Sequence, residues 1–163
     1  MTDATPLAPE HLAAYLALKE VSSLLEHAVE QQLRSDGGLS GPQFQILIRL
    51  RDSATGRLRM TDLADSLVYS RSGLTYQAAQ LEKAGLISRT PAAEDERSIE
   101  VELTPAGDEV LDKVLPGHVE VVRRLMLTAM SRTDIVALTD ILGRVRDQMR
   151  TAPPRSAASR DRR

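Results

Sequence analysis

The chain has 163 residues, 42% of them hydrophobic and 27% charged, which is enough for one domain with its own core. It shows no apolar run long enough to span a membrane, and residues 1–9 lack the basic start of a signal peptide. Without cysteine it can form no disulfide, thiolate metal site or thiol switch. We therefore expect a cytoplasmic protein. Its formal net charge of -2 argues mildly against nonspecific coating of nucleic acid, but overall charge does not exclude a local positive face.

The N-terminal part of the chain is predicted to be helical. Residues 1–8 are expected to form a flexible N-terminus, and residues 9–34 carry a broad apolar stripe that ends before the glycines at 37 and 38. Ser40 and Gln43 have the spacing of a capping box, which predicts a second helix. The apolar side of that helix holds Phe44, Leu47 and Leu50.

A pair of helices is predicted next. A short helix opens at Thr61, a residue type that caps helix N-termini, and a longer one runs from Arg71 to Lys83 after Ser70. On the longer helix three residues fall in one narrow arc that should pack into the core: Leu74, Ala78 and Leu81. Its other side presents small and polar side chains: Ser72, Thr75, Tyr76, Ala79, Gln80 and Lys83.

That polar face suits a helix inserted into the major groove of DNA, where base edges offer donors, acceptors and the thymine methyl group. We predict that the face reads bases, and that Ser70 and Arg71 hold a phosphate at the N-terminal end of the helix. The alternative interpretation is an ordinary solvated face, since polar faces are the default on soluble domains. The predicted DNA contacts on the two helices are Thr61, Ser70, Arg71, Ser72, Thr75, Tyr76 and Gln80.

A β-hairpin should follow the helix pair. Gly85 has the position of a helix C-cap, and residues 86–89 and 99–103 read as two strands, the second with alternating apolar side chains. The loop between them, residues 91–98, is longer than a tight turn. We interpret the hairpin as a wing beside the helix pair.

The loop of this wing carries the remaining predicted DNA contacts, Asp95, Arg97 and Ser98. An arginine on a protruding loop can enter the minor groove, where the negative potential attracts it, and Asp95 could orient it. The acids at residues 94–96 favour the other interpretation, a solvated loop.

Two more helices are expected after the wing. Thr104 and Pro105 are a typical N-cap and first turn for a long helix to residue 130, in which Pro116 should cause a kink. A second capping box predicts the last helix, residues 131–150. Residues 151–163 are basic and show no periodicity, so we expect a disordered tail that is solvated rather than bound to DNA.

Helix pair and wing in this order are more specific than either part. The matching stretches are LADSLVYSRSGLTYQAAQLEKAGLISR, then DERS, then LTPAG at residues 103–107. On these motifs the chain resembles the MarR family of bacterial transcription regulators over about residues 12–149. The resemblance implies a homodimer that binds a pseudo-palindromic operator, usually as a repressor, and is often released by a small aromatic or amphipathic ligand.

Many members carry arginines and an aspartate in the recognition helix where this chain has Tyr76, Ala79 and Gln80. The operator sequences of the family therefore cannot be transferred to this chain.

The resemblance also implies a ligand site between the dimerisation helices and the winged domain. We place that site near Tyr15, Phe44, Leu47 and His118, with a plain core role for Tyr15 and Phe44 as the alternative.

The expected fold is mainly α with a small β-hairpin wing, a winged helix-turn-helix with a helical dimerisation layer. We predict one domain over residues 9–150, with the winged part at about 40–104 and the dimerisation helices at about 9–34 and 105–150. Surplus apolar faces at both chain ends favour a dimer, and one recognition helix reads only a half-site. An intrachain helix bundle is the alternative use of those faces.

No motif points to catalysis. The histidines His11, His27 and His118 are far apart in sequence, and the chain has no HExxH, no phosphate-binding glycine loop and no nucleophile elbow. We predict no enzyme activity, no cofactor and no metal, although a site joining His27 and His118 stays open. The competing function is a winged helix that binds protein and has lost specific DNA binding.

Overall fold

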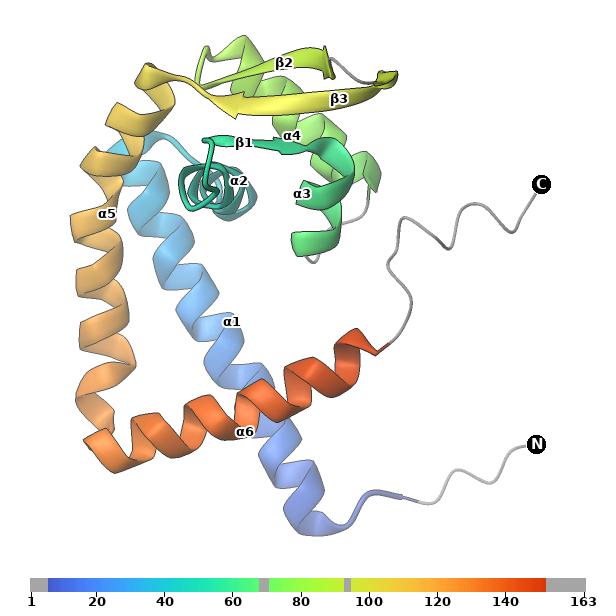
Figure 1. The fold of residues 1–163 in the computed structure, drawn as a ribbon. Helices are drawn as coiled ribbons and strands as arrows, with labels where there is room; N and C mark the ends of the chain where they lie inside the picture. Colours follow the sequence, from blue (N-terminus) through green and yellow to red (C-terminus); the bar gives the residue numbers. More distant parts are fainter. Residues whose placement is uncertain (1–5, 68–70, 93–94, 152–163) are drawn as a thin grey trace.

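The computed structural model describes residues 6–67, 71–92 and 95–151, with the backbone alone at residues 71 and 95–97. Figure 1 shows a winged part joined to long helices that extend away from it. No helix in the described part of the chain is long and apolar enough to cross a membrane. The elements in chain order are α1 (Pro9–Gly37), α2 (Gly41–Arg51), β1 (Arg57–Arg59), α3 (Met60–Ser66), α4 (Arg71–Lys83), β2 (Ile87–Ala92), β3 (Asp95–Leu103), α5 (Pro105–Leu125), a 3-10 turn (Leu127–Ala129) and α6 (Arg132–Arg150).

The winged part contains a three-stranded antiparallel sheet in the order β1-β3-β2, with α2, α3 and α4 packed against it (Figure 1). Strand β1 was not predicted, because three residues with alternating arginines give no apolar pattern. Its pairing is specific nonetheless. Arg57 lies opposite Glu102 in the register, and their side chains form an ion pair at 2.9 Å.

The prediction of a long wing loop at residues 91–98 is wrong. Strand β2 continues to Ala92 and β3 already begins at Asp95, so only residues 93–94 lie between them. The register of the β2–β3 pairing shifts between Pro91 and Ala92. Such an irregularity lets the strands stay paired past a proline and through charged residues, where the sequence shows no alternation of apolar and polar residues. Along β3, Val101 is fully buried whereas Ile99 is 36% exposed, so the wing leaves the core towards its tip.

Most predicted helix starts are confirmed. The Ser40 hydroxyl accepts from the Gln43 backbone N–H at 3.4 Å, and the same capping box at Ser131 lowers the pKa of the Asp134 carboxyl through two hydrogen bonds. Helix α3 is the exception, because it begins at Met60 with Arg59 as N-cap, so Thr61 does not cap it. Helix α5 also ends earlier than predicted, at Leu125, where the chain turns towards α6.

The start of α5 is built onto the turn between α4 and β2. The Thr104 hydroxyl donates to the Gly85 carbonyl at 2.7 Å and accepts from the Gly107 N–H at 3.1 Å. The Thr104 N–H donates to the Leu86 carbonyl at 3.2 Å. Gly85 has a φ of 73°, which favours glycine at this helix end. This junction fixes where the long helix α5 leaves the winged part.

Two further contacts hold α5 in place. It lies along α1, where Gln32 Nε2 donates to the Val114 carbonyl at 2.9 Å. At the winged end, Arg51 of α2 pairs with Asp108 at 2.9 Å and with Asp112, both on α5. The hydrogen bond with Asp112 and the charges of both carboxylates raise the pKa of Arg51 above its usual value. The winged part and the long helices are thus joined by side chains as well as by the chain itself.

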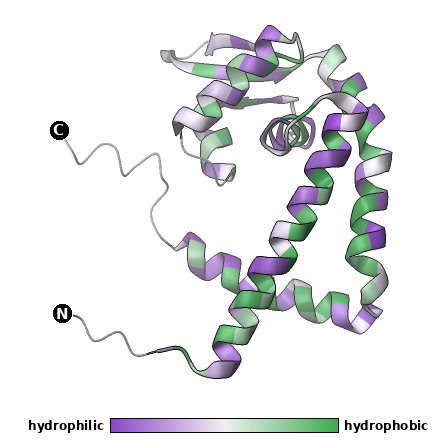
Figure 2. Ribbon diagram, turned by 180° about the vertical axis from the view of Figure 1, so that it is seen from behind, coloured by the Kyte–Doolittle hydropathy of each residue, from purple (hydrophilic) through white to green (hydrophobic). Residues whose placement is uncertain are grey.

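Many apolar side chains on the long helices are exposed in the described part of the chain. None of the residues of α6 is buried, and α6 packs closely against no other helix in the described ranges. Figure 2 shows hydrophobic residues along α6 and along the part of α1 that lies far from the sheet. The alternative of an intrachain bundle therefore holds at most for α1 and α5, which pack along each other, and not for α6. The exposed large side chains on these helices are Leu12, Tyr15, Leu16, Leu18, Val21, Leu24, Val119, Leu125, Val136, Ile141, Leu142, Val145 and Met149.

The junction predicts the effect of Gly107→Ala. A Cβ at this position would lie 2.1 Å from the Leu86 carbonyl oxygen and 2.8 Å from Leu103 Cδ1, so backbone would have to move. We expect the free energy of unfolding to fall by about 1–3 kcal/mol, the range for overpacking. Urea denaturation followed by circular dichroism measures it.

Gly143→Ala is the matched control, because no atom lies within 4 Å of a Cβ built there and the residue is inside α6. This change should be neutral or stabilise by up to about 1 kcal/mol through helix propensity. Equal effects of the two substitutions would show that the junction is not tightly packed.

Candidate nucleic-acid interface

Helix α4 buries the predicted side and exposes the predicted face. Leu74, Ala78 and Leu81 are each 0–1% exposed and belong to the main core cluster. On the other side Tyr76 is 60% exposed. Of the remaining face residues Ala79 is half-buried, and the exposed ones are Ser72, Thr75, Gln80 and Lys83. The helix therefore presents a small, hydrogen-bonding surface to solvent, as the periodicity predicts.

The other predicted DNA contacts are described to different extents. Thr61 is exposed in the first turn of α3, and Ser98 is partly exposed on β3. Ser70 lies outside the described residues. The backbones of Arg71, Asp95 and Arg97 lie in α4 and β3, while their side chains are outside the described part. The predicted contact between Asp95 and Arg97 thus stays a prediction.

An ion pair that the sequence analysis missed ties the wing to α4. Arg89 on β2 donates to Glu82 Oε2 from Nε at 2.9 Å and from Nη2 at 2.5 Å. These hydrogen bonds hold the pKa of the Glu82 carboxyl below its usual range. The turn at Gly85 reverses the chain between the two residues, which is the signal that could have revealed the pair. The wing and α4 therefore present one surface with a fixed relative orientation.

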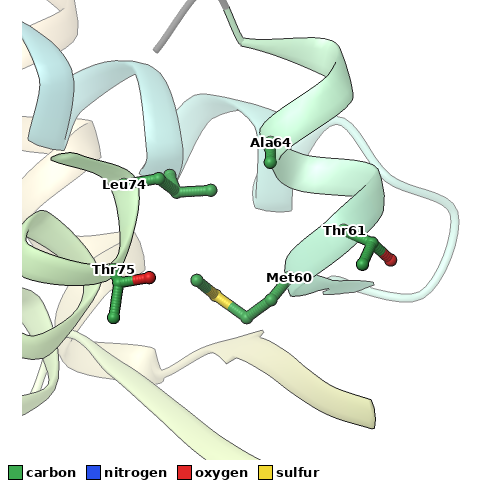
Figure 3. Close-up of a pocket in the computed structure, with 5 residues that line it drawn as sticks. All are labelled: Met60, Thr61, Ala64, Leu74 and Thr75. Carbon is green, nitrogen blue, oxygen red and sulfur yellow. The ribbon is translucent and has the colours of Figure 1, made fainter. Parts of the chain in front are cut away.

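A small hollow lies between α3 and α4, with a volume of about 130 Å³ (Figure 3). Its lining includes Met60, Ala64 and Leu74, and Thr61 and Thr75 are its two exposed members. Sequence periodicity assigns residues to helix faces but gives no spacing between two helices, so the hollow could not be predicted. It adjoins the face that is expected to read DNA.

The predicted ligand residues come together only in part. Phe44 and His118 have ring centroids 4.7 Å apart with planes tilted by 46°, and Leu47 is fully buried in the same core. Tyr15 does not join them within one chain. It is 54% exposed and lies roughly 25 Å along α1 from Gln32, the residue that contacts α5.

A larger hollow of about 510 Å³ lies between α1 and α2. Its position between a long helix and the winged part matches the expected location of a ligand site. None of the four predicted ligand residues lines it, however, because Phe44 and Leu47 point to the core side of α2. Its lining residues are Ser23, Glu26, His27, Val29, Glu30, Gly41, Pro42 and Gln45.

His27 and His118 have separate surroundings. His27 shares a hydrogen bond of 3.1 Å with Gln31 on the exposed side of α1, whereas the ring of His118 packs against Phe44. Within residues 6–67, 71–92 and 95–151, no group of three or more histidine, aspartate or glutamate side chains is arranged to hold a metal ion. The open alternative of a shared metal site gains no support from these positions.

Known proteins resemble the chain over most of its length. A sequence model of the MarR family matches residues 37–98. The HTH-type transcriptional repressor YetL of Bacillus subtilis is 33% identical over 71% of this chain and 68% of its own length. The regulator PecS of Dickeya dadantii is 33% identical over 78% and 76%. The crystal structure of Sco3205, a MarR family regulator from Streptomyces coelicolor in complex with DNA, has a TM-score of 0.84 and 31% identity, with 91% of this chain and 92% of that chain covered.

The position of His118 predicts a pH effect on stability. Burial lowers the pKa of His118, and its buried Nδ1 atom has no hydrogen-bond partner among the described residues. The unfolded chain therefore takes up this proton at a higher pH than the folded chain does. Stability should fall as the pH drops below the ordinary histidine range, about 6.5, and this loss should level off once the folded chain is also protonated.

His118→Phe keeps a ring against Phe44 and removes the proton site. Its free energy of unfolding should fall less than that of the parent chain between about pH 7.5 and about pH 5.5. Urea denaturation at both pH values measures the difference. Parallel losses in the two proteins would contradict the assignment of this effect to His118.

Proposed function

The chain belongs to the MarR family, and on that premise we propose that it is a sequence-specific DNA-binding transcriptional regulator that acts as a homodimer on a pseudo-palindromic operator. Repression is the sign of regulation that the family favours. This function places the protein in the cytoplasm, with the DNA. The observation that carries the proposal is the exposed polar face of α4, held beside the wing by the Arg89–Glu82 pair.

The proposed contacts follow from that surface. Ser72, Thr75, Tyr76 and Gln80 read base edges in the major groove from α4. Ser70, Arg71 and Thr61 hold phosphates at the N-terminal ends of α4 and α3, where backbone N–H groups are available. Arg97, oriented by Asp95 and flanked by Ser98, enters the minor groove from the wing.

The proposed homodimer uses the exposed apolar side chains of α1, α5 and α6. A single chain leaves these three helices with large hydrophobic side chains in water, and α6 without any buried residue. A second copy would cover them by a two-fold contact and would place two α4 helices on successive half-sites. The sequence-specific function and the dimer therefore support each other.

A small aromatic or amphipathic effector is also proposed, as is typical of the family. The hollow between α1 and α2 and the buried contact of Phe44 with His118 lie between the dimerisation helices and the winged part. A ligand there can lower DNA affinity only if it prefers a spacing of the two α4 helices that misfits the operator. The opposite effects of ligand and operator on this spacing would be the basis of the response.

Selection of bound fragments from random duplex DNA tests the proposal. The chain should enrich a pseudo-palindromic site, and its affinity for that site should fall steeply with salt, because cations are released from phosphates. Thr75→Ala and Gln80→Ala should each relax discrimination at particular base pairs by about 1–3 kcal/mol. Fluorescence anisotropy against the selected site and its single-base variants measures these losses.

Lys113→Ala, on an exposed position of α5 away from α4, is the control for general charge and folding effects. It should leave base preference unchanged. If no site is enriched and binding is weak at every salt concentration, the chain is the protein-binding winged helix that the sequence left open. If the Thr75→Ala and Gln80→Ala variants select the parent site with unchanged discrimination, α4 does not read the bases.

The apolar face of α6 predicts the effect of Val145→Asp. Val145 is 41% exposed in one chain and lies on the same side as Ile141 and Met149, so a charge there should disrupt the dimer. We expect a monomer in sedimentation analysis and a loss of operator affinity of at least about tenfold. Thr139→Asp, on the polar side of α6, should leave both properties unchanged. A dimeric Val145→Asp protein with parent affinity would contradict the proposed interface.

A further inference from the structure

The hollow between α3 and α4 is lined mainly by apolar side chains. Two of its five lining residues, Ala64 and Leu74, are buried, and the thioether chain of Met60 closes one side. Figure 3 shows Met60 extending from α3 towards Thr75 of α4, whose hydroxyl is turned to the same space. The hollow is thus apolar inside and carries a hydroxyl group at its edge.

Its position connects it to the reading face of α4. Thr75 belongs to both, since it is exposed among the polar residues of α4 and also lines the hollow. Thr61, the other exposed lining residue, lies at the N-terminal end of α3, where a phosphate contact is proposed. A base edge in contact with Thr75 would therefore lie over the opening.

We propose that this hollow receives the 5-methyl group of one thymine in each half-site, with Met60 and Thr75 setting the preference at that base pair. The inference rests on the proposed function and goes beyond it, because it names one base and the residues that select it. The 5-methyl group is the apolar feature of the major-groove edges, and thymine presents it beside the acceptor O4. Cytosine at the same position would direct an amino group, a donor, towards an apolar wall.

The volume of about 130 Å³ leaves room for a methyl group without movement of a side chain. Removal of one such methyl group from a buried contact should weaken binding about fourfold, and removal from both half-sites about 15-fold. Uracil differs from thymine by this group alone. Exchange of thymine for uracil therefore isolates the contact from every hydrogen bond that the base makes.

The experiment is a uracil scan of the site selected from random DNA. Each thymine is replaced by uracil at symmetric positions of both half-sites, and affinity is measured by fluorescence anisotropy at one salt concentration. One symmetric pair should cost the parent chain about 15-fold, whereas Met60→Ala should bind the thymine and uracil forms of that site equally well. Met60→Leu keeps an apolar wall of similar volume and should retain most of the discrimination.

The outcomes separate this inference from the function on which it rests. If no site is selected, the proposed function fails and the inference fails with it. If a site is bound with salt dependence but no uracil exchange matters, or the exchange costs Met60→Ala as much as the parent, the inference alone is overturned. It is also overturned if Met60→Ala changes only the release of DNA by phenolic acids, because the hollow then holds a small molecule and not a base.

Circular dichroism and sedimentation of the two Met60 variants establish that they are folded dimers. Met60 is half-buried at the start of α3, so its replacement could disturb the helix pair. If a disturbed helix pair were the cause, Met60→Leu would also bind more weakly, and it would bind the thymine and uracil forms of the site equally. Loss of the thymine preference in Met60→Ala and its retention in Met60→Leu is the pattern that only a methyl contact produces.

Discussion

The hydroxyl of Thr104 joins two parts of the molecule that must act together. It donates to the carbonyl of Gly85, in the turn after α4, and accepts from the N–H of Gly107 in the first turn of α5. The absence of a side chain at Gly107 lets this helix start lie directly against the Leu86 carbonyl. The end of α4 and the start of α5, which leads to the long helices, are therefore in direct contact.

The remaining contacts transmit this constraint to both sides of the junction. Arg89 on β2 pairs with Glu82 of α4, which connects the wing to the helix. Arg51 holds α5 through Asp108, and Gln32 holds it to α1. Rotation of the long helices against each other would therefore carry α4 with it. An effector between α1 and α2 would act through the same ties, since a ligand shifts a conformation only by binding one spacing better than another.

Sequence periodicity and capping chemistry predicted the elements that depend on local interactions. The buried arc of α4, the capping boxes at Ser40 and Ser131 and the α5 start at Thr104 all follow from side chains within four residues of each other. The order of helix pair and wing was read from the same local patterns, and the MarR family resemblance rests on that order. What the sequence did not predict depends on long-range pairing. Strand β1 exists because β3 is there to pair with it, and the wing extends past Pro91 because the register can shift.

The candidate site shows the same division. The exposed face of α4 was predictable from the angular spacing of residues around a helix. The Arg89–Glu82 pair and the hollow at Met60 depend instead on how two elements are placed relative to each other. Tyr15 was placed near Phe44 because the family resemblance implies a region for the ligand site. That region does not specify which turn of a helix borders the site. Within one chain Tyr15 belongs instead to the exposed apolar side of α1, where a second copy would bury it.

The central claim is that two copies of α4 are held at one fixed spacing on DNA through the junction with α5. Because the chain has no cysteine, Lys83→Cys at the exposed end of α4 carries a single spin label in each copy. Pulsed electron resonance then measures the distance between the two labels on the selected operator. The account predicts one narrow distance distribution, compatible with α4 helices about 34 Å apart on successive half-sites. Absence of a dipolar signal, or a broad distribution on operator DNA, would contradict it.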